Sequence, residues 1–120
     1  PDVYMEKLAY GPGYDPDLIT LEMTPSERVE KLAKAKGCRP KDLMICILER
    51  PRHQNLINEI RETGARLRLI TDGDVAGVIH CADTARTGID IYMGSGAFYL
   101  LIYCIYLRCL PIVPMFLAYR

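Results

Sequence analysis

Two arginines stand one residue apart at the start of an expected helix, where they could hold an anion. Arg50 and Arg52 flank Pro51 in the segment 49–53. A helix N-terminus carries partial positive charge, so each cation there is unfavourable by about 0.3–1 kcal/mol. Guanidinium groups bind phosphate through paired hydrogen bonds. The spacing therefore indicates a phosphate-binding loop, with two solvent-facing side chains as the alternative interpretation.

Two carboxylates occur in the next expected strand-to-helix loop, Asp72-Gly73-Asp74. An aspartate that caps a helix and a glycine that suits a turn are ordinary features, and they account for one of the two acids. A pair of carboxylates at a crevice can also accept hydrogen bonds from vicinal sugar hydroxyls. Both interpretations stay open at this point.

Two glycines enclose a serine in the third expected loop, Gly94-Ser95-Gly96, which should end a strand and open a helix. Glycines there let backbone N–H groups approach an anion closely. Tyr99 replaces the last glycine of a full GxGxxG fingerprint, so a tight turn is the alternative. Together the three loops suit a phosphorylated sugar, and none of them pairs a nucleophile with a base.

An alternation of strands and helices must position these loops. Thr24 and Glu27 predict a capping box, and Gly37 predicts the end of the helix that follows. Residues 2–8 fit either a strand or a short helix. Further along, apolar patterning predicts strands at 43–48, 66–70 and 89–93, helices at 52–63 and 74–82, and a helical stretch from about Ala97. This order implies a parallel sheet whose carboxyl ends, and so all three loops, face one crevice.

Composition narrows the class of protein. Fifteen acidic and fifteen basic residues balance, which gives no indication of a nucleic-acid partner. Five cysteines without a CxxC pair favour a reducing, cytoplasmic setting over a disulfide framework, and two histidines make a zinc site a poor expectation. The chain opens without a leader, and we expect it to be the interior of something longer.

A resemblance to a known family rests on five segments: DVYMEKL (2–8), ERPRH (49–53), EIRETGAR (59–66), ITDGDVA (70–76) and DIYMGSG (90–96). In order and spacing they resemble the class II, or GlpX-type, fructose-1,6-bisphosphatases over roughly residues 1–96. The resemblance implies an α/β fold, a layered α/β/α arrangement with a mainly parallel sheet. This is like the C-terminal half of the inositol-monophosphatase/fructose-bisphosphatase superfamily.

The same resemblance implies an activity and a set of contacts. Family members are metal-dependent phosphatases that release the 1-phosphate of fructose 1,6-bisphosphate in gluconeogenesis or the Calvin cycle, and some also take sedoheptulose 1,7-bisphosphate. A tyrosine near a chain start is usually explained by packing, and only the resemblance assigns a role to Tyr4. The residues expected to contact the sugar bisphosphate are Tyr4, Arg50, Pro51, Arg52, Asp72, Gly73, Asp74 and Gly96.

The implied cofactor is Mn²⁺ or Mg²⁺, ions that prefer carboxylate oxygens. In the family the ligands come mainly from the preceding half, so this chain alone should be inactive and should hold no catalytic residue. The implied partners are the sugar bisphosphate, the missing N-terminal half and, when the protein is complete, further copies of itself.

Residues 97–120 form an apolar tail that departs from the family pattern. Where the family continues with Gly-Ala-Pro-Glu-Gly, whose glutamate is a further metal ligand, this chain has apolar residues around Leu100 and no carboxylate from Met93 to Arg120. The tail approaches the length of a membrane span, but Arg108, Pro111 and Pro114 argue against one. A buried helix or an altered tail is the preferred interpretation.

The leading hypothesis is therefore a bisphosphatase fragment that binds a phosphorylated ketose without hydrolysing it alone. Two alternatives stay open: a non-catalytic sugar-phosphate binding module, and a membrane-associated fragment that uses the apolar tail.

Overall fold

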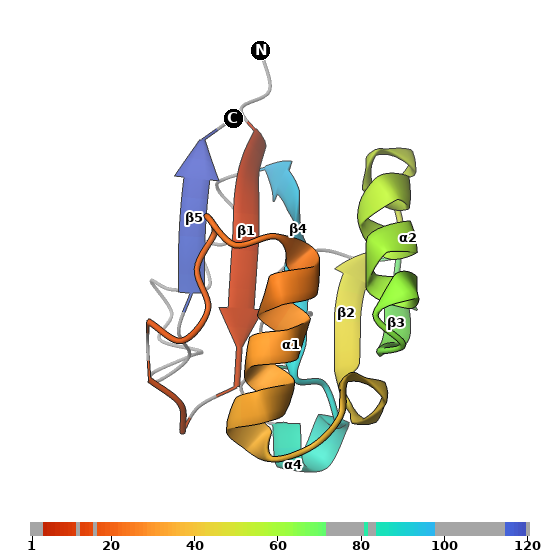
Figure 1. Cartoon of the computed structure of the whole chain (residues 1–120). Coiled ribbons are helices and arrows are strands. Elements are labelled where there is room, and N and C mark those ends of the chain that lie inside the picture. Colours follow the sequence, from red (N-terminus) through yellow and green to blue (C-terminus); the bar gives the residue numbers. More distant parts are fainter. Residues whose placement is uncertain are drawn as a thin grey trace.

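The computed structural model describes residues 4–11, 13–15, 17–71, 81, 84–97 and 115–119 of the 120-residue chain. These residues form one five-stranded sheet in the order β3-β2-β4-β1-β5, with helices packed against it (Figure 1). The strands are β1 (Tyr4–Tyr10), β2 (Met44–Leu48), β3 (Arg66–Ile70), β4 (Ile91–Ala97) and β5 (Met115–Tyr119). The helices are α1 (Pro25–Lys36), α2 (Gln54–Glu62) and α4 (Thr84–Thr87), with 3₁₀ turns η1 (Pro40–Asp42) and η2 (Pro51–His53).

The sheet is mixed. β2 pairs in parallel with β3 and with β4, as expected for strands joined by helical crossovers. β1 pairs antiparallel with both β4 and β5, so it runs against the other four strands. The strand alternation implied a parallel sheet, and β1 departs from it, so the sheet is parallel only among the other strands; the carboxyl ends of β2, β3 and β4 do meet at one edge.

Alternate residues of the central strands face two apolar layers. Ile45 and Ile47 of β2 point to the face that α1 and α2 cover, and they are fully buried there (Figure 1). Cys46 and Tyr92 point to the opposite face, where Cys81 and Ile89 pack against them. Burial on both faces explains why β2 is a continuous apolar run. The expected helix at 74–82 lies outside the described residues except for Cys81, so the second helical layer stays a prediction.

Helix α1 begins and ends where its sequence predicts. The Thr24 hydroxyl oxygen accepts a hydrogen bond from the Glu27 N–H at 3.2 Å, which satisfies one of the N–H groups left open at a helix start. Gly37 ends the helix with a φ of 74°, a left-handed conformation that glycine adopts without strain. The amino end of α1 lies over β4, near the carboxyl edge of the sheet.

Two elements depart from expectation. Gly94, Ser95 and Gly96 do not form a turn after a strand, because β4 continues through them and pairs them with Lys7, Glu6 and Met5 of β1. The prediction of a helix from about Ala97 is wrong at both ends of that segment. Ala97 is the last residue of β4, and β5 is a strand that pairs with the outer edge of β1. Residues 98–114 lie outside the described part of the chain.

Within the described residues, no helix combines the length and the apolar character needed to cross a membrane.

Candidate functional site

Arg50 ties the loop after β2 to the loop after β3. Its guanidinium donates to the Glu49 carbonyl at 2.7 Å and to the Thr71 carbonyl at 3.1 Å. The Glu49 N–H donates to the Ile70 carbonyl at 2.7 Å, which extends the parallel pairing beyond the strand ends. The first two predicted loops therefore begin side by side.

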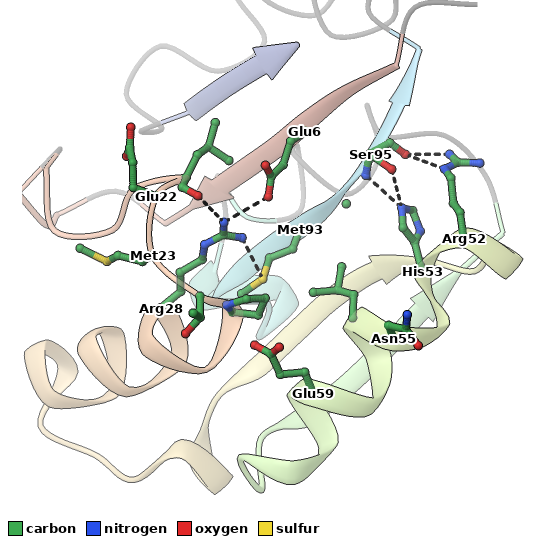
Figure 2. A pocket seen from close by; sticks show the side chains of 15 residues that line it. Glu6, Glu22, Met23, Arg28, Arg52, His53, Asn55, Glu59, Met93 and Ser95 are labelled. Atoms are coloured by element: carbon green, nitrogen blue, oxygen red, sulfur yellow. Dashed lines mark hydrogen bonds and ion pairs between the residues drawn. The ribbon is translucent and has the colours of Figure 1, made fainter. Parts of the chain in front are cut away.

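Arg52 ties the same loop to β4 on the other side. Its Nε and Nη2 atoms both donate to the Ser95 carbonyl, at 3.1 and 2.7 Å (Figure 2). The two arginines thus diverge from Pro51, Arg50 towards β3 and Arg52 towards β4. The two side chains line two different cavities. That one anion lies between them stays a prediction, and their divergence gives it no direct support.

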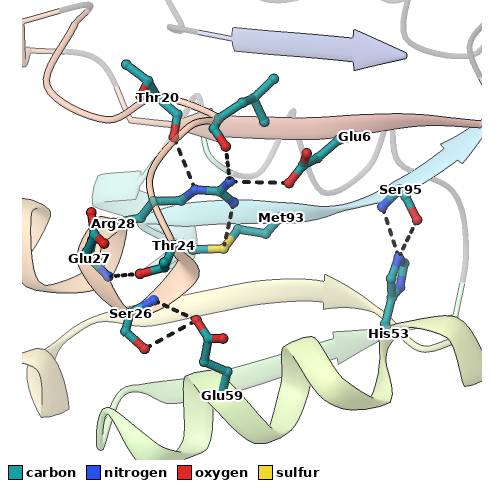
Figure 3. A network of polar contacts seen from close by, with 11 residues as sticks. Glu6, Thr20, Thr24, Ser26, Glu27, Arg28, His53, Glu59, Met93 and Ser95 are labelled. Atoms are coloured by element: carbon teal, nitrogen blue, oxygen red, sulfur yellow. Dashed lines mark hydrogen bonds and ion pairs between the residues drawn. The ribbon is translucent and has the colours of Figure 1, made fainter. Parts of the chain in front are cut away.

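His53 is buried between these loops, with 3% of its surface exposed. Its Nδ1 lies 2.6 Å from the Leu48 carbonyl oxygen, and its Nε2 accepts the Ser95 N–H at 2.9 Å (Figure 3). A carbonyl oxygen can only accept, so Nδ1 carries the ring proton and Nε2 offers its lone pair. The geometry thus selects one neutral tautomer.

The absence of a side chain at Gly94 makes room for this ring. A Cβ atom at that position would lie 3.2 Å from His53 Cε1 and 3.3 Å from Nε2, closer than nearly all such contacts. Glycine within a strand often marks such a close approach. The glycine that looked like part of an anion-binding turn therefore serves the packing of a histidine.

A cavity of about 500 Å³ opens between β4, the start of α1 and α2 (Figure 2). Arg52 and His53 form one wall, and Asn55 and Glu59 of α2 stand opposite the α1 start. The remaining lining residues are Glu6, Leu21, Glu22, Met23, Thr24, Pro25, Arg28, Leu56, Met93, Gly94 and Ser95.

Arg28 forms the floor of this cavity and is 3% exposed. Its guanidinium pairs with Glu6 at 3.3 Å and donates to the carbonyls of Thr20 and Leu21 at 3.2 and 3.1 Å (Figure 3). It also lies 3.7 Å from the Met93 sulfur. A buried charge needs such partners to offset its lost hydration, so Arg28 is a structural cation.

Carboxylates supply the negative side of the cavity. Glu59 accepts from the Ser26 N–H at 3.0 Å and from its hydroxyl at 3.3 Å, and so occupies the place where a helix start would attract an anion (Figure 3). At the rim, hydrogen bonds from its own backbone and from the Thr20 hydroxyl lower the pKa of Glu22. Both acids favour polar or hydroxyl-rich groups over phosphate in this part of the cavity.

The second cavity lies on the β3 side and has a volume of about 510 Å³. It is lined by Glu49, Arg50, Pro51, Gln54, Ile57, Arg61 and Leu69.

Comparison with known proteins decides the family. The family described as bacterial fructose-1,6-bisphosphatase, glpX-encoded, matches residues 1–99. The chain belongs to this family.

Curated relatives agree with that membership. A protein named D-fructose 1,6-bisphosphatase class 2/sedoheptulose 1,7-bisphosphatase from Trichodesmium erythraeum (strain IMS101) is 41% identical over 97 residues. A protein of the same name from Prochlorococcus marinus (strain NATL1A) is 42% identical over 97 residues. Each alignment covers 81% of this chain but 28% of the relative, so the chain spans little more than a quarter of the relatives it matches.

The glpX-family residues predicted to bind sugar are described to different extents. Arg50, Pro51 and Arg52 lie at the carboxyl edge as expected. Tyr4 and Gly96 lie on adjacent strands near that edge, since the backbone of Tyr4 is opposite Ala97 and that of Met5 is opposite Gly96. Asp72, Gly73 and Asp74 lie outside the described residues, so the predicted closeness of Arg52 and Asp74 stays a prediction.

The described residues do not fit a metal ion. No group of three or more His, Cys, Asp or Glu side chains among them could hold one. The position near Leu100, where a family glutamate was expected to be replaced, also lies outside the described part. We therefore assign no metal ligand to any residue that the structure describes.

Sequence reasoning missed several residues that build this edge. His53 belongs to the segment 49–53, but nothing in the local sequence indicates which backbone groups its ring will contact. Arg28 carried a usable signal, since it lies one helical turn before the buried Leu32 and so had to fall on the inner face of α1.

Proposed function

We propose that this chain provides the sugar-phosphate-binding side of a metal-dependent phosphatase acting on fructose 1,6-bisphosphate, and also on sedoheptulose 1,7-bisphosphate. The family match over residues 1–99 carries this proposal, because it includes the connections that follow β2 and β3 and the whole of β4. The names of the relatives support both substrates.

In this proposal the arginines bind phosphate while the backbone holds them in place. A guanidinium has five N–H groups, and the contact between Arg52 and the Ser95 carbonyl uses those on Nε and Nη2. Arg50 is held in the same manner by two carbonyls. Such contacts restrict long side chains before a ligand arrives, which lowers the entropic cost of binding.

The remaining predicted contacts concern the sugar. Asp72 and Asp74 accept hydrogen bonds from its hydroxyl groups, with Gly73 between them allowing close approach. Tyr4 and Gly96 contact the substrate from the ends of β1 and β4, which the register of these two strands brings together. The acidic lining of the 500 Å³ cavity beside Arg52 is also suited to hydroxyl-rich groups.

The chemical step belongs to Mn²⁺ or Mg²⁺, held by carboxylates that lie outside the described residues and, in this proposal, mainly in the part of the family that this chain does not span. Such an ion would polarise the phosphoryl group and activate water. Assembly with that part, and with further copies of the chain, is part of the same proposal.

Calorimetric titration with fructose 1,6-bisphosphate tests the binding role. We expect Arg52→Ala to weaken binding about 10- to 100-fold, the usual effect of removing a hydrogen-bonded charge. Arg66→Ala is the matched control, because Arg66 is an exposed arginine at the opposite edge of the sheet, where it donates to the Asp42 carbonyl. Equal losses in both variants would contradict the assignment.

Phosphate release with Mn²⁺ present tests the fragment proposal. We expect no release by this chain alone, and robust hydrolysis would overturn the view that the metal-holding part lies elsewhere.

A further inference from the structure

Ser95 is held at both polar groups of its backbone by consecutive residues of one loop. Its N–H donates to His53 Nε2 at 2.9 Å, and its carbonyl accepts from Arg52 at 3.1 and 2.7 Å (Figure 2). His53 is itself tied to Leu48, the last residue of β2, at 2.6 Å. A continuous line of hydrogen bonds therefore runs from β2 through His53 and Ser95 to the guanidinium of Arg52.

The tautomer of His53 makes this line directional. Its Nδ1–H can only donate and its Nε2 can only accept, which suits the carbonyl on one side and the N–H on the other. The ring is nearly fully buried and fills the space beside Gly94, which restricts its orientation. Arg52 is exposed, and its orientation depends on where the Ser95 carbonyl points.

The same geometry argues against a nucleophilic role for Ser95. Its hydroxyl lies 3.4 Å from His53 Nε2, whereas its N–H lies at 2.9 Å and takes the lone pair. Because the backbone N–H is the nearer donor to the lone pair of Nε2, this nitrogen is poorly placed to activate the hydroxyl.

We propose that His53 is a positioning residue: as the Nδ1-protonated tautomer it fixes the Ser95 peptide and so orients Arg52 for the sugar phosphate. This inference rests on the proposed function and adds to it a residue that acts through the orientation of Arg52. In this role His53 affects the affinity for the sugar phosphate, and it does so through the backbone of β4.

Two substitutions separate this role from simple packing. In His53→Gln the side-chain oxygen can reach the place of Nε2 and accept the Ser95 N–H, whereas His53→Asn is too short to do so. We expect His53→Asn to bind fructose 1,6-bisphosphate about tenfold more weakly than the wild-type chain, and His53→Gln to stay within about threefold, measured by calorimetry. Asn58→Ala, on the exposed side of α2, is the control for nonspecific change.

The outcomes distinguish the two proposals. Absence of binding by the wild type counts against the proposed function. Equal binding by wild type and His53→Asn, or equal weakening by both substitutions, overturns this inference alone.

Nitrogen NMR of the wild-type histidine ring keeps the inference testable if the variants do not fold. We expect Nδ1 to be protonated and Nε2 unprotonated, and we expect saturating fructose 1,6-bisphosphate to shift the Ser95 amide resonance. The opposite tautomer, or a Ser95 amide resonance that does not shift when the sugar phosphate binds, would overturn the inference.

Discussion

The two edges of the sheet use charged residues in different ways. At the amino edge, Asp90 is 4% exposed, pairs with Lys36 of α1 at 2.7 Å and accepts the Met44 N–H at 2.9 Å. At the carboxyl edge, Arg50 and Arg52 donate to the carbonyl oxygens of other loops. The ion pair links a helix to the sheet, whereas the backbone carbonyls restrict the orientation of the two guanidinium groups. The amino edge holds α1 on the sheet, and the carboxyl edge fixes the orientation of two arginine side chains.

The largest expected effect is a loss of stability on removing the Asp90 carboxylate at the amino edge. Asp90→Ala removes the partner of Lys36 and leaves the Met44 N–H without its acceptor, so we expect a loss of about 2–3 kcal/mol of unfolding free energy. Urea unfolding followed by circular dichroism measures it. Asp17→Ala, at an exposed position, is the control and should change stability by less than about 0.5 kcal/mol. A loss as small as the control's would remove the structural contrast between the two edges.

The next effect concerns the packing at the carboxyl edge. Gly94→Ala places a methyl group against the His53 ring, so we expect about 1–2 kcal/mol of destabilisation together with weaker sugar-phosphate binding. Combining it with His53→Ala, which empties that space, should cost less than the sum of the two single changes. Strict additivity in this double-mutant cycle would show that the two residues do not interact.

The smallest effect is a pH dependence at the amino edge. The hydrogen bond that Lys36 donates to the Asp90 carboxylate raises the pKa of Lys36 above its ordinary 10.5. The stability that this interaction contributes is therefore fully present below about pH 10.5. It is lost as the pH rises through the pKa of Lys36 in the folded state. Because the Lys36 side chain is 39% exposed and solvent screens its charge, we expect this interaction to contribute under about 1 kcal/mol to the free energy of unfolding.

Comparison of wild type with Lys36→Met across pH 9–12 isolates this term. Tyr10, whose pKa is raised by burial, also lowers stability above its ordinary pKa, and it does so equally in both proteins. A difference between the two proteins that does not shrink over this range would contradict the assignment.

Local elements of the fold followed from short stretches of sequence. Thr24 and Gly37 bound α1 as their capping preferences predict, and the apolar run before Glu49 became β2. The order of strands and helices likewise predicted that the loops after β2 and β3 begin side by side, which the contact of Arg50 with the Thr71 carbonyl confirms. Such signals are complete within a few residues, so no partner is needed to interpret them.

Pairings between distant residues could not be predicted in this way. Gly94, Ser95 and Gly96 resemble a turn in isolation, but β1 pairs with them and extends β4 through the whole segment. Likewise, residues 115–119 look like part of an apolar helix until the open edge of β1 is present to receive them as a strand. A strand depends on hydrogen-bond partners elsewhere in the chain, so its limits and direction are properties of the sheet.

The sequence by itself determined which chemical groups stand near the ends of consecutive strands, such as the arginines after β2 and the glycines late in β4, and it carries the segments by which the chain matches the glpX family. Only the tertiary structure decided how they are used, turning Arg50 and Arg52 towards different strands and placing His53 between Leu48 and Ser95. Residue types and local preferences are encoded nearby in the chain, whereas the acceptor of Arg52 lies 43 residues away and exists only once β4 is aligned with β2.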